Sequence, residues 1–226
     1  SDGTELRVYP DSDHTLYTLA NGTDLLLENH PQTPENTIAV AKKNIDHLEE
    51  NAKAAVLAYY EERGRLYDIM EELEKAAAIY QQSQNKENFS MMRIEQNVYP
   101  TAANDRLIFF QTSLHLPLAE KTFTERNLCE VFDRKTGTYI PIEDLFICPL
   151  EELGSQLLAM AHLSDADRAD METAFRREYI FFTEDSLCID FPAGSLTNYK
   201  EQYIVPLKYT SDLRGLMHDW AIPKEG

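Results

Sequence analysis

The sequence predicts an α+β protein in which one long helix precedes an antiparallel β-sheet meander and short helices pack on the sheet. Residues 34–83 contain no proline after position 34, and their apolar residues recur every three or four positions, which is typical of an amphipathic helix. Stretches after residue 88 alternate apolar and polar residues and are separated by polar turns, which is typical of consecutive strands.

The N-terminal part, residues 5–30, contains short apolar groups that favour strands. Asn21 and Gly22 lie between two of these groups. An Asn-Gly dipeptide favours a two-residue hairpin turn, because both residues tolerate positive φ. We therefore expect a β-hairpin here, with an ordered arm lacking a hairpin as the alternative.

The predicted helix begins after a break at residues 30–33. Thr33 is expected to cap it, and Pro34 suits the first helical position, where its missing N–H needs no partner. The spacing favours one helix to about Ser83, or two helices separated at Gly64, because glycine inside a helix costs about 1 kcal/mol. A coiled-coil dimer is disfavoured by the Tyr, Ala and Met residues at would-be seam positions.

The meander is predicted from three alternating stretches. Phe89–Tyr99, Arg106–Leu118 and Lys121–Asp133 read as strands, and Pro100–Asp105 reads as the first turn. After the third strand, polar residues cluster around Gly137, which we expect at positive φ in a hairpin turn.

The rest of the chain alternates short helices with strands. Ser164 and Ser211 are expected to cap helices, because a serine hydroxyl accepts from the free amides of a first turn. The expected elements are, in order, an extended piece and helical turn at Ile140–Phe146, a helix at Pro149–His162, a helix after Ser164, strands at Tyr179–Phe182 and Leu187–Phe191, a loop at Pro192–Gln202, a strand at Tyr203–Leu207 and a last helix after Ser211.

We expect a single α+β domain over residues 1–226. Its first part, 5–130, would hold the N-terminal strands, the long helix and the meander, and its second part would be 130–222. The sequence has no internal repeat and no change of composition sharp enough for a boundary.

The charge of the chain is strongly acidic. Lys and Arg number 21 against 39 Asp and Glu, a net charge of −18. This disfavours nucleic acids and anionic lipid surfaces, both of which require basic residues. A cationic partner would be attracted, although acidity also keeps soluble proteins apart.

The sequence offers no catalytic, metal-binding or cofactor motif. GxSxG, GxxxxGK[ST], GxGxxG and HExxH are all missing, and no two histidines are three or four positions apart. Carboxylate pairs such as Glu49-Glu50 are adjacent in sequence and favour a solvated face over a catalytic pair. Cys129, Cys148 and Cys188 form no CxxC pair and are expected to be buried free thiols. We therefore assign no catalytic residue, no metal ligand and no cofactor.

The candidate binding residues lie around the polar loop near the C-terminus. Tyr199 and Tyr203 flank part of this loop, with Asn198 beside them, and could line a binding surface. The alternative is that both tyrosines are rim residues of the sheet.

Two motifs resemble a known family. Residues 131–146 read VFDRKTGTYIPIEDLF, and residues 181–191 and 198–217 read FFTEDSLCIDF and NYKEQYIVPLKYTSDLRGLM. In this order they resemble the PdaC/RsiV-like extracellular domain. That domain occurs in peptidoglycan deacetylases, in lysozyme-sensing anti-sigma factors and in uncharacterised secreted or lipid-anchored proteins of Gram-positive bacteria.

The resemblance covers residues 130–220 and has one departure. Members often carry a glycine-rich GGAHG segment between the second and third meander strands, where this chain reads LPLAEKTFTE. Any function of that loop is therefore not implied here. The paired-aspartate and histidine motif of a deacetylase domain is also absent from the sequence.

The resemblance implies a noncatalytic extracellular or cell-surface module for binding or sensing. Its partner would be a cell-wall component such as a peptidoglycan fragment, or a cationic protein such as lysozyme. Any membrane attachment would come from an anchor outside this chain. The alternatives are a cell-wall-directed hydrolase that uses scattered carboxylates, and a structural protein that oligomerises through the long helix.

Overall fold

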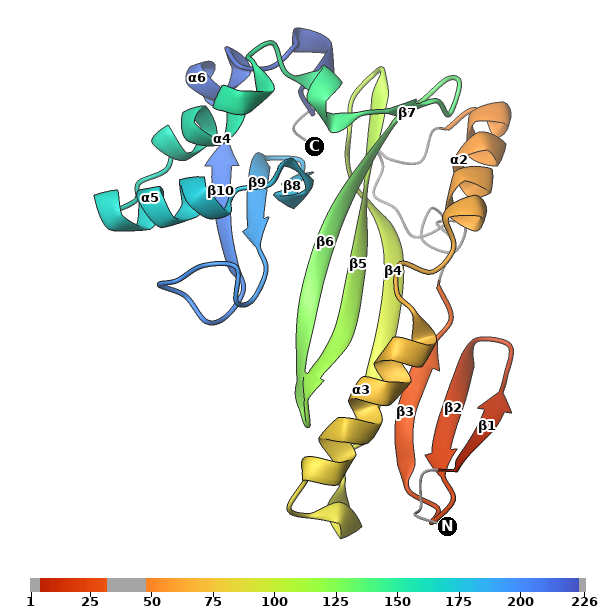
Figure 1. Cartoon of the computed structure of the whole chain (residues 1–226). Helices are drawn as coiled ribbons and strands as arrows, with labels where there is room; N and C mark the ends of the chain where they lie inside the picture. Colours follow the sequence, from red (N-terminus) through yellow and green to blue (C-terminus); the bar gives the residue numbers. More distant parts are fainter. Residues whose placement is uncertain (1–4, 32–47, 224–226) are drawn as a thin grey trace. The chain divides into compact units, whose positions relative to one another are not determined.

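The computed structural model describes residues 5–31 and 48–223 (Figure 1). These divide into two compact units, one comprising residues 5–31, 63–97 and 113–125 and the other 48–62, 98–112 and 126–223. The α+β class is confirmed. The prediction of a single domain stays a prediction.

The strands form two sheets. The larger sheet has the order β1-β2-β3-β4-β5-β6-β7, and the smaller has the order β10-β9-β8. The strands are β1 (Leu6–Pro10), β2 (His14–Leu19), β3 (Asp24–Asn29), β4 (Met92–Ala103), β5 (Leu107–Ala119), β6 (Thr122–Asp133), β7 (Tyr139–Ile140), β8 (Ile180–Phe182), β9 (Ser186–Phe191) and β10 (Tyr203–Lys208).

Pairing is antiparallel except between β3 and β4, which run parallel. Short turns join β4 to β5 and β5 to β6, and connections this short allow only antiparallel neighbours. The predicted meander and the hairpin at Asn21-Gly22 are thus confirmed, and Gly22 has φ +89°. The predicted turn at Pro100–Asp105 is wrong in its start, because β4 continues to Ala103.

The single long helix is not confirmed. Within the described residues the region holds α2 (Glu50–Arg63) and α3 (Ile69–Gln82), which matches the two-helix alternative. Gly64 has φ +58°, outside the helical range. The expected cap Thr33 and first residue Pro34 lie outside the described residues.

Gln96 and Asp68 account for the interruption between the helices. The Gln96 side chain on β4 accepts from the Leu66 amide at 2.8 Å and donates to the Gly64 carbonyl at 2.8 Å. Asp68 then caps α3 by accepting from the amide of Met70 at 2.8 Å. These hydrogen bonds satisfy the Leu66 and Met70 amides and the Gly64 carbonyl, which have no partner within a helix.

The remaining helices are short. They are α4 (Leu150–Ala159), α5 (Asp165–Ala174), α6 (Ser211–Arg214) and the 3₁₀ turns η1 (Lys86–Asn88), η2 (Ile142–Leu145), η3 (Arg177–Tyr179) and η4 (Asp219–Ala221). Ser164 caps α5 as predicted. The predicted cap Ser211 is wrong, since Thr210 accepts from the Leu213 amide and Ser211 is the first helical residue.

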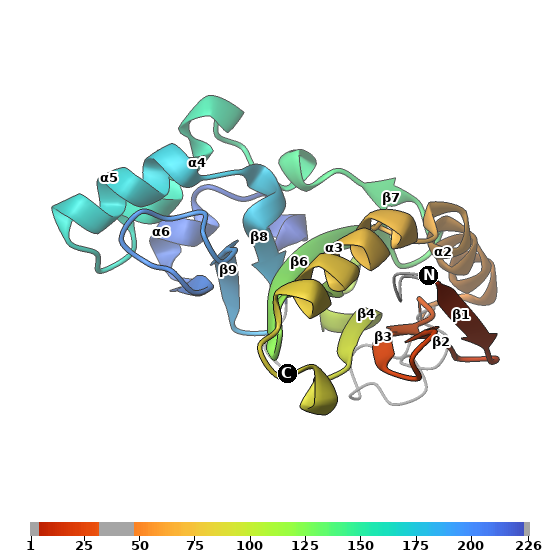
Figure 2. The same cartoon turned by 60° about the horizontal axis from the view of Figure 1, so that its bottom comes forward.

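The first unit has its core between α3 and the sheet, and Figure 2 shows α3 lying over β3 and β4. Leu73 and Ala76 of α3 pack with residues of β2, β3 and β4, including Leu25, Leu26 and Ile94. Glu28 of β3 is fully buried beside this core. Its carboxylate accepts from the hydroxyls of Tyr17 and Tyr67 at 3.0 and 2.7 Å and pairs with Nε of Arg65 at 2.7 Å.

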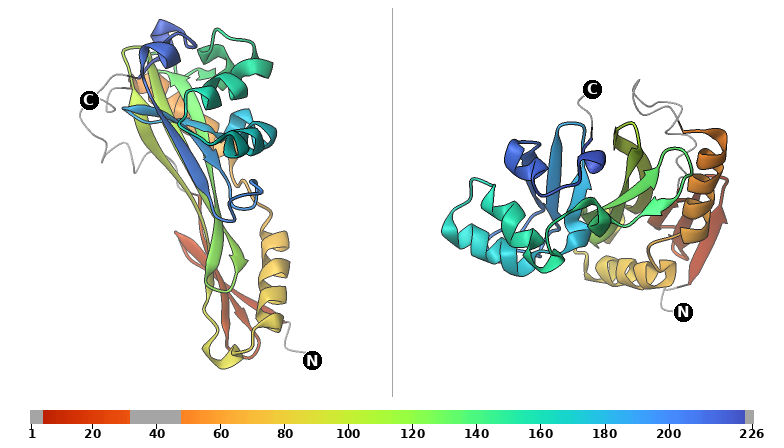
Figure 3. Two further views of the ribbon diagram at one scale, coloured as in Figure 1. Left: turned by 90° about the vertical axis from the view of Figure 1, so that its left-hand side faces the viewer. Right: turned by 90° about the horizontal axis from the view of Figure 1, so that it is seen from above.

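The second unit has two apolar clusters. Val56 and Tyr60 of α2 pack with Ile108, Phe110 and Phe132, which come from β5 and β6. The larger cluster combines alternate residues of these strands with α4, α5 and the smaller sheet, and both views in Figure 3 show α4 and α5 beside that sheet. This cluster positions β10 and the loop that precedes it.

The turn at Gly137 packs closely against α2. Gly137 has φ +72°, and a Cβ there would lie 2.5 Å from the Ala52 carbonyl oxygen of α2. Gly194 has φ +79° but nothing within 4 Å. We expect Gly194→Ala to cost about 1 kcal/mol from backbone strain, and Gly137→Ala at least about twice that because the Ala52 backbone must also move. Urea unfolding measures both, and equal losses would contradict this packing.

The Glu28 cluster predicts a loss of stability at high pH. Burial and then the Glu28 hydrogen bond raise the pKa of Tyr17 to about 12. A raised pKa means that the folded state retains the proton longer than the unfolded chain does, so stability falls between about pH 10 and 12. We expect Tyr17→Phe to be less stable at pH 8 by about 1.5 kcal/mol and to lose less stability from pH 8 to 11. A variant whose pH profile parallels that of the parent would contradict this.

Candidate binding site

The loop before β10 is held by two carboxylates of α5. Asp170 accepts from the amides of Thr197 and Asn198 at 2.8 and 3.1 Å and also from the Thr197 hydroxyl. Asp167 accepts from the Asn198 side-chain amide at 3.2 Å. These hydrogen bonds lower the pKa of Asp170, with the Thr197 hydroxyl the largest cause. The loop is therefore fixed at its centre.

The predicted residues Asn198, Tyr199 and Tyr203 come together beside this anchor. The rings of Tyr199 and Tyr203 lie 4.3 Å apart between centroids, and both pack against the core of the unit. Lost solvation, followed by the charge of Asp167, raises the pKa of the Tyr199 phenol. Asn198 is occupied in holding the loop, whereas the tyrosine pair forms an aromatic rim. A binding role for the three residues stays a prediction.

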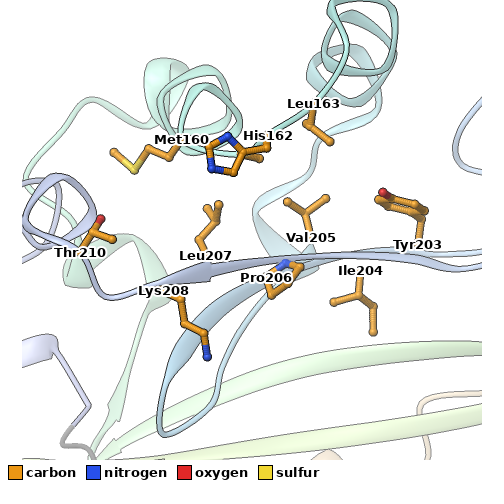
Figure 4. A pocket seen from close by; sticks show the side chains of 11 residues that line it. Met160, His162, Leu163, Tyr203, Ile204, Val205, Pro206, Leu207, Lys208 and Thr210 are labelled. Carbon is orange, nitrogen blue, oxygen red and sulfur yellow. The ribbon is translucent and has the colours of Figure 1, made fainter.

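A cavity of about 400 Å³ extends from Tyr203 along β10. Its other wall is the connection between α4 and α5, residues 160–163 (Figure 4). The side chains of Tyr203, Val205 and Leu207 point toward this wall, and those of Ile204 and Pro206 point away. His162 and Met160 face the strand from the wall. We call this cavity the β10 groove.

β10 is an edge strand of its sheet. Among the described residues it pairs only with β9, in the antiparallel register that sets Pro206 opposite Cys188. Proline has no N–H to donate. It is therefore suited to a position on β10 where the backbone N and C=O point away from β9. By the same alternation, Ile204 and Lys208 direct their N–H groups toward the open edge. An extended polypeptide could therefore pair with this edge.

The sequence did not indicate the 160–163 wall of the groove. The predicted helix Pro149–His162 is too long, because α4 ends at Ala159, and this leaves His162 in the connection that faces β10. Packing of α4 and α5 on the smaller sheet brings the two segments together. The strand alternation of Val205 and Leu207 was the one available signal, and it indicated only a buried face.

In the described part of this unit, the buried carboxylates Asp190 and Glu130 are both engaged within the protein. Asp190 accepts from the side-chain amides of Asn127 and Gln202, each at 2.8 Å. Glu130 accepts from the hydroxyls of Tyr60 at 3.0 Å and Thr112 at 2.9 Å. Within the described ranges, no group of three His, Cys, Asp or Glu side chains is placed to hold a metal ion.

The three cysteines carry free thiols, but the predicted burial is confirmed for Cys188 alone. Cys188 is buried, while Cys129 and Cys148 are half-buried. Burial raises the pKa of the Cys188 thiol, which disfavours the reactive thiolate. In residues 5–31 and 48–223, no helix is both long enough and apolar enough to cross a membrane.

Comparison with known proteins gives structural neighbours alone. No family model matches the chain, and no curated protein matches it. A DUF3298 family protein from Pseudomonas aeruginosa PAO1 is 17% identical, with 57% of this chain and 65% of that protein covered and a TM-score of 0.38. A DUF3298 family member from Bacteroides fragilis NCTC 9343 is 10% identical, with 97% and 96% covered and a TM-score of 0.47.

The match spans less than two thirds of the Pseudomonas protein. Both TM-scores lie below 0.5, so the likeness assigns neither a family nor a function to this chain.

The anchored loop predicts local protection from exchange. In Asp170→Ala the amides of Thr197 and Asn198 lose their acceptor, so we expect their hydrogen exchange to become at least about tenfold faster. Asp165→Ala removes a carboxylate from the same helix that contacts neither amide, and it serves as the control. Amide exchange followed by NMR measures both variants. Unchanged protection in Asp170→Ala would contradict the anchoring role.

Proposed function

We propose that this protein is a noncatalytic extracellular binding module that recognises a cationic polypeptide at the β10 groove and its tyrosine rim. A cationic protein such as a lysozyme is the ligand we favour, and a peptidoglycan fragment is the competing candidate. The observation that carries the proposal is the groove of about 400 Å³ beside an edge strand, with Asp167 and Asp170 next to its aromatic end.

The chemistry of the rim suits a basic side chain. The rings of Tyr199 and Tyr203 lie side by side, and the Asp167 carboxylate is close to the Tyr199 phenol. A lysine or arginine gains both from a π face and from a nearby negative charge. The net charge of −18 adds attraction at longer range and speeds encounter with a cationic partner.

The edge of β10 adds a second means of recognition. Main-chain hydrogen bonds to the edge supply affinity that does not depend on the ligand's sequence. The groove beside Val205 and Leu207 can accept apolar side chains of the ligand. The buried carboxylates of this unit are already occupied by protein donors, which favours binding over acid–base chemistry as its role.

Calorimetry with hen egg lysozyme and with muramyl dipeptide tests this proposal. We expect lysozyme to bind at low salt and to bind more weakly as salt rises, because the attraction is screened. Replacing both Tyr199 and Tyr203 by alanine should weaken binding by about tenfold or more.

Tyr9→Ala is the matched control, since Tyr9 is half exposed on β1 and lies outside the groove. Equal losses in the control and the double variant would place the contact elsewhere. Absence of lysozyme binding at low salt would refute the cationic-protein version, and binding of muramyl dipeptide alone would favour the cell-wall version.

A further inference from the structure

The first unit also contains a cavity, which shares no residue with the β10 groove of the second unit. It has a volume of about 380 Å³ and lies at the end of the larger sheet where β5 turns into β6. Its size is within the range of small-molecule sites. The lining comes from β4, β5, β6 and their turn: Met91, Met92, Arg93, Glu95, His115, Pro117, Ala119, Lys121, Thr122 and Phe123.

The alternation of β4 places Arg93 and Glu95 of the lining on the face opposite the core. Met92 and Ile94 are buried in the core with α3. Arg93 and Glu95 alternate with them and line the cavity. The cavity therefore lies mainly on the face opposite the core and borders the core at Met92, which belongs to both.

Part of its lining is apolar and exposed. Phe123 of β6 is 56% exposed, and its ring lies 4.8 Å from the His115 ring between centroids. His115 lies 3.6 Å from the Glu125 carboxylate, which also accepts from the Ser113 hydroxyl at 3.0 Å. Phe123 is therefore held by a local contact while one side of it remains open to a ligand.

The cavity also carries positive charge. Arg93 and Lys121 line it with a single carboxylate, Glu95, which accepts from the Asn29 side-chain amide at 3.0 Å. Among the described residues, neither Arg93 nor Lys121 forms an ion pair. Two basic residues and one acid give the lining a positive balance, unlike the acidic chain as a whole, and Glu125, which contacts His115, is not a lining residue.

The β5–β6 turn fixes the position of Lys121. Its φ is +66°, an uncommon conformation for a residue with a side chain. The preceding Glu120 accepts from the Ser83 hydroxyl at 2.9 Å and from the Ser90 amide at 3.4 Å. The turn is thus tied to the end of α3, and this fixes the backbone of Lys121 beside the cavity that it lines.

We propose that this cavity binds a small amphipathic anion, such as a medium-chain carboxylate. The apolar part of the ligand would lie against Phe123, Pro117 and Met91. Its carboxylate would meet Arg93 and Lys121. Charge complementarity selects this class over neutral and cationic amphiphiles, because only an anion gains from both basic residues.

Titration with decanoate and with decyltrimethylammonium tests the proposal, because both carry a ten-carbon chain and differ in charge. We expect decanoate to bind and to shift the amide NMR signals of residues 91–95 and 115–123, with no comparable shift from the ammonium. Equal binding of the two amphiphiles would overturn the proposal.

Paired variants separate the charge from the apolar contact. The double variant Arg93→Gln, Lys121→Gly should weaken decanoate binding by about tenfold or more, and glycine suits the positive φ at position 121. Arg7→Gln, on exposed β1, is the charge control. Phe123→Ala should also weaken binding, whereas Leu118→Ala, exposed on β5 but outside the lining, should not.

Thermal melts of all variants identify any that fail to fold. If folded charge variants bind decanoate as tightly as the parent, the proposal is wrong. Sedimentation with phosphatidylglycerol vesicles but no decanoate binding would assign the patch to a lipid surface and also overturn it.

Discussion

The carboxylate of Glu28 is fully buried, and its three partners determine how the first unit is assembled. A buried charge without partners costs several kcal/mol, so the chain must bring donors to it. Tyr17 comes from the neighbouring strand, whereas Arg65 and Tyr67 come from the segment between α2 and α3. That segment is thereby fixed against the sheet, and α3 can begin immediately after it.

The second unit follows the same constraint with different donors. Glu130 of β6 is satisfied by Tyr60 of α2, and Asp190 of β9 by Asn127 of β6 and by Gln202 just before β10. Each of these carboxylates therefore connects elements that are far apart in sequence. The apolar clusters supply most of the favourable free energy, while the polar contacts specify which segments meet. The position of β10, and with it the groove, depends on both.

Local patterns predicted most of the elements, because alternation and capping are properties of neighbouring residues. The strands, the hairpin at Asn21-Gly22, the Ser164 cap and the positive φ of Gly137 all followed from such patterns. The division of the long helix depended on Gln96, about thirty residues from the break, and the sequence could only offer Gly64 as one alternative. The tyrosine pair was predicted as a flank of the loop. Its anchoring by Asp170 and the wall at 160–163 arise from tertiary packing, which no spacing rule encodes.

Pro206 also affects how β10 behaves when no ligand is present. An exposed edge strand can pair with the same strand of another molecule, which leads to open-ended aggregation. The missing N–H at Pro206 interrupts any continuous ladder of backbone hydrogen bonds. A short heterologous segment can still use the donors on either side of the proline. The same residue therefore lets the edge remain available for recognition while keeping a concentrated solution of the protein from polymerising through it.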